Sequence, residues 1–157
     1  MGEGNKRVYF FDTSALVKRY HREAGTDVVD AAFEDKDATR VISDISVIEF
    51  YSAFAKKVRV GEITKEDFRD TVKELAGNIQ SGVVQLAFFG ESEKKEATAL
   101  IEKYGLSRSL RTLDAMQLQV MKRLGAQVIT HVYCADRPFA PLVEEEGFSV
   151  INPEVSS

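Results

Sequence analysis

Cysteine is nearly absent from the sequence, since Cys134 is the only one in 157 residues. A lone thiol forms no internal disulfide and no cysteine-rich zinc site, and it suits a reducing compartment. The segment His21-Arg22-Glu23 matches the beginning of a zinc-deaminase signature. That signature also needs a Pro-Cys-x-x-Cys segment, which one cysteine cannot supply, so zinc-deaminase chemistry is excluded. We interpret His21 and His131 as ordinary surface or strand histidines.

Long apolar runs and an excess of positive charge are also missing. No apolar stretch approaches the roughly 20 residues of a membrane-spanning helix. The charged segment 1–7 has no apolar core after it, unlike a signal peptide. The net charge of -4 argues against a protein that coats nucleic acid by bulk positive charge, but leaves room for a local basic rim. We expect a cytoplasmic protein with no membrane partner.

The chain also lacks repeats, low-complexity segments and convincing linkers. Its 157 residues, 44% hydrophobic and 29% charged, match the length and composition of one soluble globular domain. The sequence therefore predicts a single domain over residues 1–157, with loose tails at about 1–6 and 154–157.

What the sequence does contain is an alternation of short apolar runs with segments of helical periodicity. The apolar runs predict buried strands at 8–12, 40–43, 83–88, 128–134 and 148–151. Apolar spacings of three and four predict a first helix that begins near Ser14. Six further helices are predicted at about 26–33, 45–58, 64–80, 93–104, 112–124 and 138–146. Ser92 and Thr112 are the expected caps of the helices that follow them. This order predicts an α/β fold with a mainly parallel sheet covered on both faces.

Two aspartates, Asp12 and Asp136, each follow an apolar strand. Ligands of an open parallel sheet bind at the carboxyl ends of its strands, so both side chains should emerge on the same edge. Each aspartate also has a purely structural interpretation, as a helix cap or a turn acid. For Asp136 this second interpretation rests on Arg137-Pro138, which follows directly and can open a helix.

Two further acids, Glu49 and Asp114, lie inside predicted helices. Glu49 is the only charged residue within 45–55, and a carboxylate in such a segment is costly to bury unless it is paired or binds a cation. Asp114 is in the first turn of its helix, where the helix dipole alone favours a carboxylate. Arg108 and Arg111 precede it and would place guanidinium groups near a bound phosphate, although a solvated loop is the alternative for either.

Taken as a set, these four acids indicate a metal site. Converging carboxylates raise one another's pKa, and a hard divalent cation such as Mg²⁺ or Mn²⁺, which takes oxygen ligands, removes the conflict. A bound metal lowers the pKa of a water and neutralises charge on a phosphate. We expect Asp12, Glu49 and Asp114 to anchor metal, and Asp136 to help hold it or to orient the attacking water.

Four blocks of the sequence follow one another in an informative order, at Phe10–Lys18, Val47–Phe50 with Ala53, Arg111–Leu118 and Cys134–Phe139. Their succession resembles that of PIN-domain ribonucleases of the VapC toxin type. The resemblance implies a three-layer α/β/α sandwich, with one or two Mg²⁺ or Mn²⁺ ions bound by the four acids. It also implies that Thr13 or Ser14 supports the site, and that the protein is a homodimer held inactive by a cognate antitoxin.

The main hypothesis is therefore an endoribonuclease that depends on Mg²⁺ or Mn²⁺, is the toxin of a toxin-antitoxin pair, and binds RNA through Arg108 and Arg111. The alternatives are a housekeeping RNA-processing PIN nuclease and a catalytically silent PIN-fold module that binds RNA or protein. A phosphatase that forms an aspartyl-phosphate is a rival enzyme class, because it also begins with a strand that ends in Asp. Such an enzyme needs a second acid two residues later, where this chain has Ser14, so the sequence disfavours it. The apolar helical stretch 45–79 offers surface for a dimer or antitoxin contact, although core packing explains most of its residues.

Overall fold

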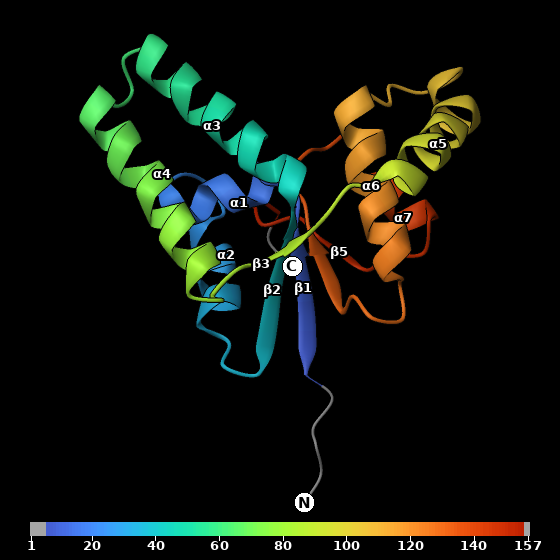
Figure 1. Cartoon of the computed structure of the whole chain (residues 1–157), viewed down its shortest axis with the longest axis horizontal. Coiled ribbons are helices and arrows are strands. Elements are labelled where there is room, and N and C mark those ends of the chain that lie inside the picture. Colours follow the sequence, from blue (N-terminus) through green and yellow to red (C-terminus); the bar gives the residue numbers. More distant parts are fainter. Residues whose placement is uncertain (1–5, 156–157) are drawn as a thin grey trace, which may run out of the picture.

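The computed structural model describes residues 6–155. At its centre is a five-stranded sheet in the order β3-β2-β1-β4-β5 (Figure 1). The strands are β1 (Arg7–Phe11), β2 (Ala38–Ser43), β3 (Gln85–Ala87), β4 (His131–Tyr133) and β5 (Val150–Ile151). All four pairings of neighbours are parallel. The prediction of a mainly parallel sheet is therefore confirmed, with β1 in the middle.

The third and fourth strands are shorter than the apolar runs that predicted them. The Val84 amide donates to the carbonyl of Asn78 in the preceding helix, and the amides of Val128 and Ile129 both donate to the carbonyl of Gly125. The first bond closes the end of a helix and the other two form a turn just after one, so these amides are not available to the strands. An apolar run shows that a segment is buried, but it does not show which partner takes its amides.

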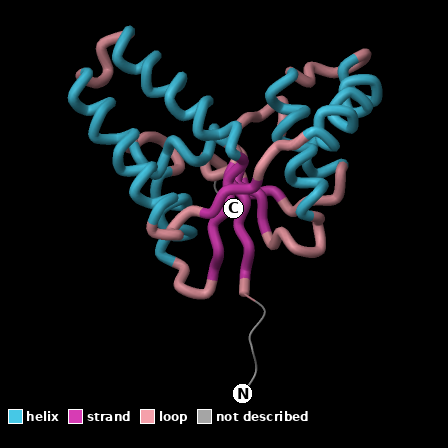
Figure 2. Tube along the Cα trace, in the orientation of Figure 1, coloured by secondary structure: helices cyan, strands magenta, loops and turns pink. Residues whose placement is uncertain are grey.

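Helices cover both faces of the sheet (Figure 2). One face carries α1 (Thr13–Tyr20), α2 (Thr26–Glu34), α3 (Asp44–Arg59) and α4 (Lys65–Gln80). The other carries α5 (Glu91–Leu100), the π-helical turn η1 (Ile101–Gly105), α6 (Thr112–Leu124) and α7 (Ala140–Glu145). Successive residues of β1 point to opposite faces, with Phe10 in the α5–α7 core and Phe11 in the α1–α4 core. The predicted three-layer α/β/α sandwich is confirmed.

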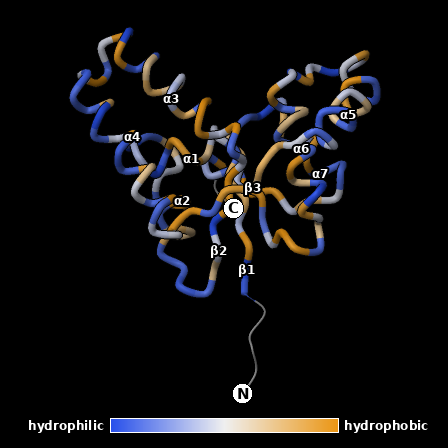
Figure 3. The backbone as a smooth tube through the Cα atoms, in the orientation of Figure 1, coloured by the Kyte–Doolittle hydropathy of each residue, from blue (hydrophilic) through white to orange (hydrophobic). Residues whose placement is uncertain are grey.

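The α3–α4 pair and the α5–α6 pair diverge beyond the carboxyl edge of the sheet, giving the molecule a V shape (Figure 1). Apolar residues are concentrated where helices meet the sheet, and hydrophilic residues are frequent on the outer turns (Figure 3). Among residues 6–155, no helix is both long and apolar enough to cross a membrane.

Two predicted caps are wrong. The helix expected to begin after Ser92 has Gly90 as its N-cap, because the carboxylate of Glu93 reaches back to the Gly90 amide at 2.9 Å. The helix expected to be capped by Thr112 has Arg111 as its N-cap, with Asp114 accepting the Arg111 amide at 3.4 Å. In both helices an acid at the third position supplies the capping contact and moves the start towards the amino terminus.

The carboxy-terminal segment is anchored by an ion pair. Lys18 of α1 is buried, and its ammonium contacts Glu23 at 3.0 Å and Glu154 at 2.9 Å. Glu154 is therefore fixed on the domain, although it falls within the expected tail 154–157. Residues 1–5 and 156–157, which belong to the two expected tails, lie outside the described residues.

A glycine holds this segment close to α2. Gly25 has a φ of 89°, and a Cβ added there would lie 2.7 Å from the Pro153 carbonyl oxygen. Gly61 has a similar φ of 79° and open space around it. We predict that Gly61→Ala lowers the free energy of unfolding by about 1–2 kcal/mol through left-handed strain, and that Gly25→Ala lowers it further because of the clash. Urea unfolding of both variants tests this, and equal losses would contradict it.

Candidate active site

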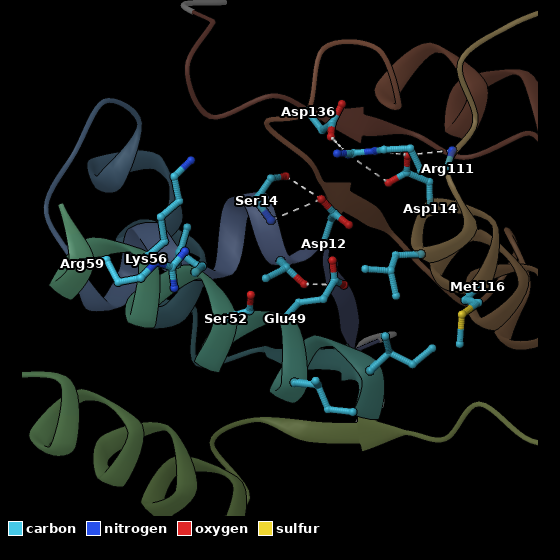
Figure 4. Close-up of a pocket in the computed structure, with 16 residues that line it drawn as sticks. Asp12, Ser14, Glu49, Ser52, Lys56, Arg59, Arg111, Asp114, Met116 and Asp136 are labelled. Carbon is cyan, nitrogen blue, oxygen red and sulfur yellow. Dashed lines mark hydrogen bonds and ion pairs between the residues drawn. The ribbon is translucent and has the colours of Figure 1, made fainter.

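A cavity of about 590 Å³ opens at the carboxyl edge of the sheet, between α3 and α6 (Figure 4). The segments that line it are the start of α1, one face of α3, the start of α6 and the loop after β4. Its lining residues are Asp12, Thr13, Ser14, Val17, Ile45, Ile48, Glu49, Ser52, Ala53, Lys56, Arg59, Arg111, Leu113, Asp114, Met116 and Asp136. The structure thus brings together all four acids that the sequence singled out.

Asp12 lies at the junction of β1 and α1 and is buried. It is the N-cap of α1, so its structural interpretation is correct: its carboxylate accepts the Ser14 amide at 3.2 Å and the Ser14 hydroxyl at 2.5 Å. Burial raises the pKa of Asp12 to about 6, the Ser14 hydrogen bonds oppose the rise, and the negative charges of Glu49 and Asp114 add to it. Asp12 is therefore a cap that also faces two other carboxylates.

Glu49 extends from α3 and is held by neutral donors. Its Oε1 accepts the Thr13 hydroxyl at 3.0 Å and the Gln117 amide Nε2 at 2.8 Å. Gln117 also donates to the Ser46 hydroxyl at 2.7 Å, and it is buried. Sequence reasoning found Thr13 but missed Ser46 and Gln117. A signal for Gln117 was available, because it lies one helical turn after Asp114 within an otherwise apolar face of α6.

Arg111 joins the two remaining acids. Its guanidinium donates from Nε to Asp114 at 3.1 Å and from Nη2 to Asp136 at 2.7 Å (Figure 4). Arg108 is not brought into the cavity. It pairs instead with Glu145 and lies over the Tyr104 ring at 5.7 Å. Of the two predicted RNA-binding arginines, only Arg111 lines the site.

The acids that face the cavity offer carboxylate oxygens, and these are the ligands that a hard divalent cation prefers. In the part of the chain that the structure describes, no three His, Cys, Asp or Glu side chains are grouped closely enough to hold a metal ion as they stand. The Arg111 guanidinium pairs with both Asp114 and Asp136, so its single positive charge offsets only part of their negative charge. Asp12, in contrast, bears uncompensated negative neighbours, and this is the conflict that a cation relieves.

The fold and the cavity together define an α/β domain with an acidic site at the carboxyl edge of a parallel sheet. The sequence profile of the PIN domain family matches residues 9–131, and the chain belongs to this family. The match includes Asp12, Glu49 and Asp114 and ends before Asp136. No curated protein matches the chain significantly.

Solved structures share the fold. Mycobacterium tuberculosis VapC20, a sarcin-ricin loop cleaving toxin, superposes with a TM-score of 0.67 and 18% identity over 95% of this chain and 99% of that one. A toxin-antitoxin complex from Klebsiella pneumoniae gives 0.60 and 16%, covering 92% and 97%. VapBC2 from Rickettsia felis, bound to a DNA fragment from its promoter, gives 0.60 and 12%, covering 92% and 98%. The resemblance to VapC-type PIN domains is confirmed at the level of the fold.

The raised pKa of Asp12 has a consequence for stability. The folded state holds a proton on Asp12 up to about pH 6, whereas the ordinary value is 3.8, so stability falls as pH rises between these values. At about 1.4 kcal/mol for each pH unit, ionised Asp12 costs roughly 3 kcal/mol. Because Asn caps a helix as well as Asp does, we predict that Asp12→Asn is more stable than the wild type at pH 7.5 in EDTA, with the difference lost near pH 4.

Urea unfolding at the two pH values measures this effect. Asp70, an exposed acid of α4, provides the control, and Asp70→Asn should change stability equally little at both. An Asp12→Asn variant less stable than the wild type at pH 7.5 would contradict the account of the site.

Proposed function

We propose that this chain is an endoribonuclease that requires Mg²⁺ or Mn²⁺ and hydrolyses RNA phosphodiester bonds. The observation that carries the proposal is the convergence of Asp12, Glu49, Asp114 and Asp136 in one cavity from four separate parts of the chain. Membership of the PIN domain family, a family of nucleases, supports a hydrolase that acts on nucleic acid.

The residues divide into ligands and supports. The carboxylates of Asp12, Glu49 and Asp114 would hold the cation, and Asp136 would help to hold it or would orient the attacking water. When bound, such a cation lowers the pKa of a water and neutralises charge that develops on the phosphate. Ser14 fixes the carboxylate of Asp12. Supporting residues of this kind matter because they set the direction in which each ligand points.

Thr13 and Gln117 perform the same task for Glu49. Arg111 has a different role, because it supplies the positive charge that Asp114 and Asp136 now share. If Asp114 and Asp136 were engaged by a cation, the planar guanidinium of Arg111 would be free to pair with a phosphate through two N–H groups. The side chain would thus change from an internal counter-ion to a contact with the substrate.

We also propose that the protein is the toxin of a toxin-antitoxin pair, acts in the cytoplasm, forms a homodimer and is held inactive by a cognate antitoxin. The support is the shared fold with VapC20 and with the Klebsiella pneumoniae and Rickettsia felis complexes. A housekeeping RNA-processing nuclease would use the same site. A catalytically silent PIN-fold binding module is favoured only by the pairing of Arg111 with both Asp114 and Asp136.

The proposal makes a direct prediction for cleavage. Purified wild-type protein with Mn²⁺ should cut a labelled RNA pool, and EDTA should stop it. Asp12→Asn and Asp114→Asn should each lower the rate by at least about 100-fold, because each removes a charged ligand worth several kcal/mol of transition-state stabilisation.

Asp70→Asn, which removes an equal charge outside the cavity, should cut like the wild type. Cleavage that survives in both site variants would contradict the assignment of the site. Binding of RNA without metal and without product would instead support the silent binding module.

A further inference from the structure

Two cations line the cavity on the side opposite Arg111. Lys56 and Arg59 come from the second half of α3, and Figure 4 shows them beside each other, on the far side of Ser52 from Glu49. Both side chains belong to exposed residues. Sequence reasoning did not single them out, although Lys56 follows Glu49 by seven residues and therefore lies on the same face of the helix.

Among residues 6–155 neither of these two cations forms an ion pair. The adjacent Lys57 shows the contrast, because it contacts Glu62 at 3.1 Å and Glu23 at 3.5 Å. In a chain of net charge -4, free positive charge beside an acidic site is an attraction point for a polyanion.

On the cavity face of α3, the residues between Glu49 and Lys56 have small side chains. Ser52 and Ala53 lie one turn after Glu49 and leave the face of α3 open as far as Lys56. At 1.5 Å per residue, Lys56 is about 10 Å and Arg59 about 15 Å along the helix axis from Glu49. This length is enough to span a few nucleotides of a bound strand.

Apolar side chains stand on both sides of the cavity. Ile48 of α3 is 73% exposed and Leu113 of α6 is 44% exposed. Two of the four acids are nearly covered, since Asp12 is 6% and Asp114 8% exposed. A phosphate must therefore enter the cavity to reach the acids, and base faces are the only part of a nucleic acid that benefits from the apolar walls. An unpaired strand offers those faces, whereas a duplex keeps them stacked inside.

We infer that the cavity takes an unpaired RNA strand whose backbone follows α3 from Glu49 to Lys56 and Arg59. Phosphates a few nucleotides from the scissile bond pair with these two cations. Bases nearer the acids lie against Ile48 and Leu113. This inference rests on the proposed function, because it places the substrate of that reaction in the same cavity.

The test measures binding separately from cleavage. Fluorescence anisotropy of a labelled 12-nucleotide single-stranded RNA is recorded with Mn²⁺ at 50 to 200 mM salt, using Asp12→Asn protein to prevent cutting. Adding Lys56→Ala and Arg59→Ala should lower the slope of log affinity against log salt by about 1.4, since each contact to a single strand contributes about 0.7. The salt-dependent loss of affinity over this range should then shrink about sevenfold.

The matched control is Lys36→Ala with Lys95→Ala in the same background. These two exposed lysines lie outside the cavity, and replacing both by alanine removes the same total charge as the Lys56 and Arg59 pair. The control should keep the slope of the parent, and exchanging the two cations as Lys56→Arg with Arg59→Lys should keep it too. An equal slope for the two alanine pairs, or no measurable binding of the single strand by the parent, would overturn the inference.

Two further comparisons complete the test: single-stranded RNA against duplex RNA, and binding against cleavage. The same RNA annealed to its complement should bind the parent at least about tenfold more weakly, and equal binding of the duplex would overturn the choice of an unpaired strand. If the wild type cuts RNA but replacing Lys56 and Arg59 leaves the slope unchanged, this inference is contradicted and the nuclease activity is still supported. If the slope changes as predicted but the wild type never cuts RNA, the contacts of Lys56 and Arg59 with RNA are supported and the proposed reaction is contradicted.

Discussion

The structure depends on the buried carboxylate of Asp12, whose negative charge is costly to bury beside other acids. It ends the central strand and caps the first helix, so it cannot move far from the centre of the sheet. Burial and two neighbouring acids raise its pKa to about 6. Ser14 offsets part of this cost with two hydrogen bonds. The rest is left uncompensated within the protein, and such a conflict is typical of functional sites rather than of structural ones.

The parallel topology explains why the acids meet. β1 and β4 are neighbours, so the residues that follow them, Asp12 and Asp136, emerge on one edge of the sheet. Helices α3 and α6 begin at the same edge and bring Glu49 and Asp114 to the cavity from opposite faces. The cavity lies between these two helices, which diverge beyond the sheet. The fold therefore brings the acids together at one edge of the sheet.

Much of this arrangement could be predicted from the sequence, because the strongest signals are local. The buried run before Asp12 predicted β1, and apolar spacings of three and four over 45–58 predicted α3. Contacts between distant residues were harder to predict. Gln117 holds Glu49 across 68 positions, and Arg108 turns to Glu145 across 37, neither of which leaves a local pattern. Lys56 and Arg59 look like an ordinary solvated face until the cavity beside them is known.

The claim that the four acids form a cation site is tested most directly by titrating Mn²⁺ into the purified protein in an isothermal calorimeter. The account predicts saturable binding of one or two ions by the wild type, together with clear loss of affinity in Asp114→Asn. Asp70→Asn should bind like the wild type, because Asp70 lies outside the cavity. Absence of binding at millimolar Mn²⁺, or equal binding by all three proteins, would contradict the central claim.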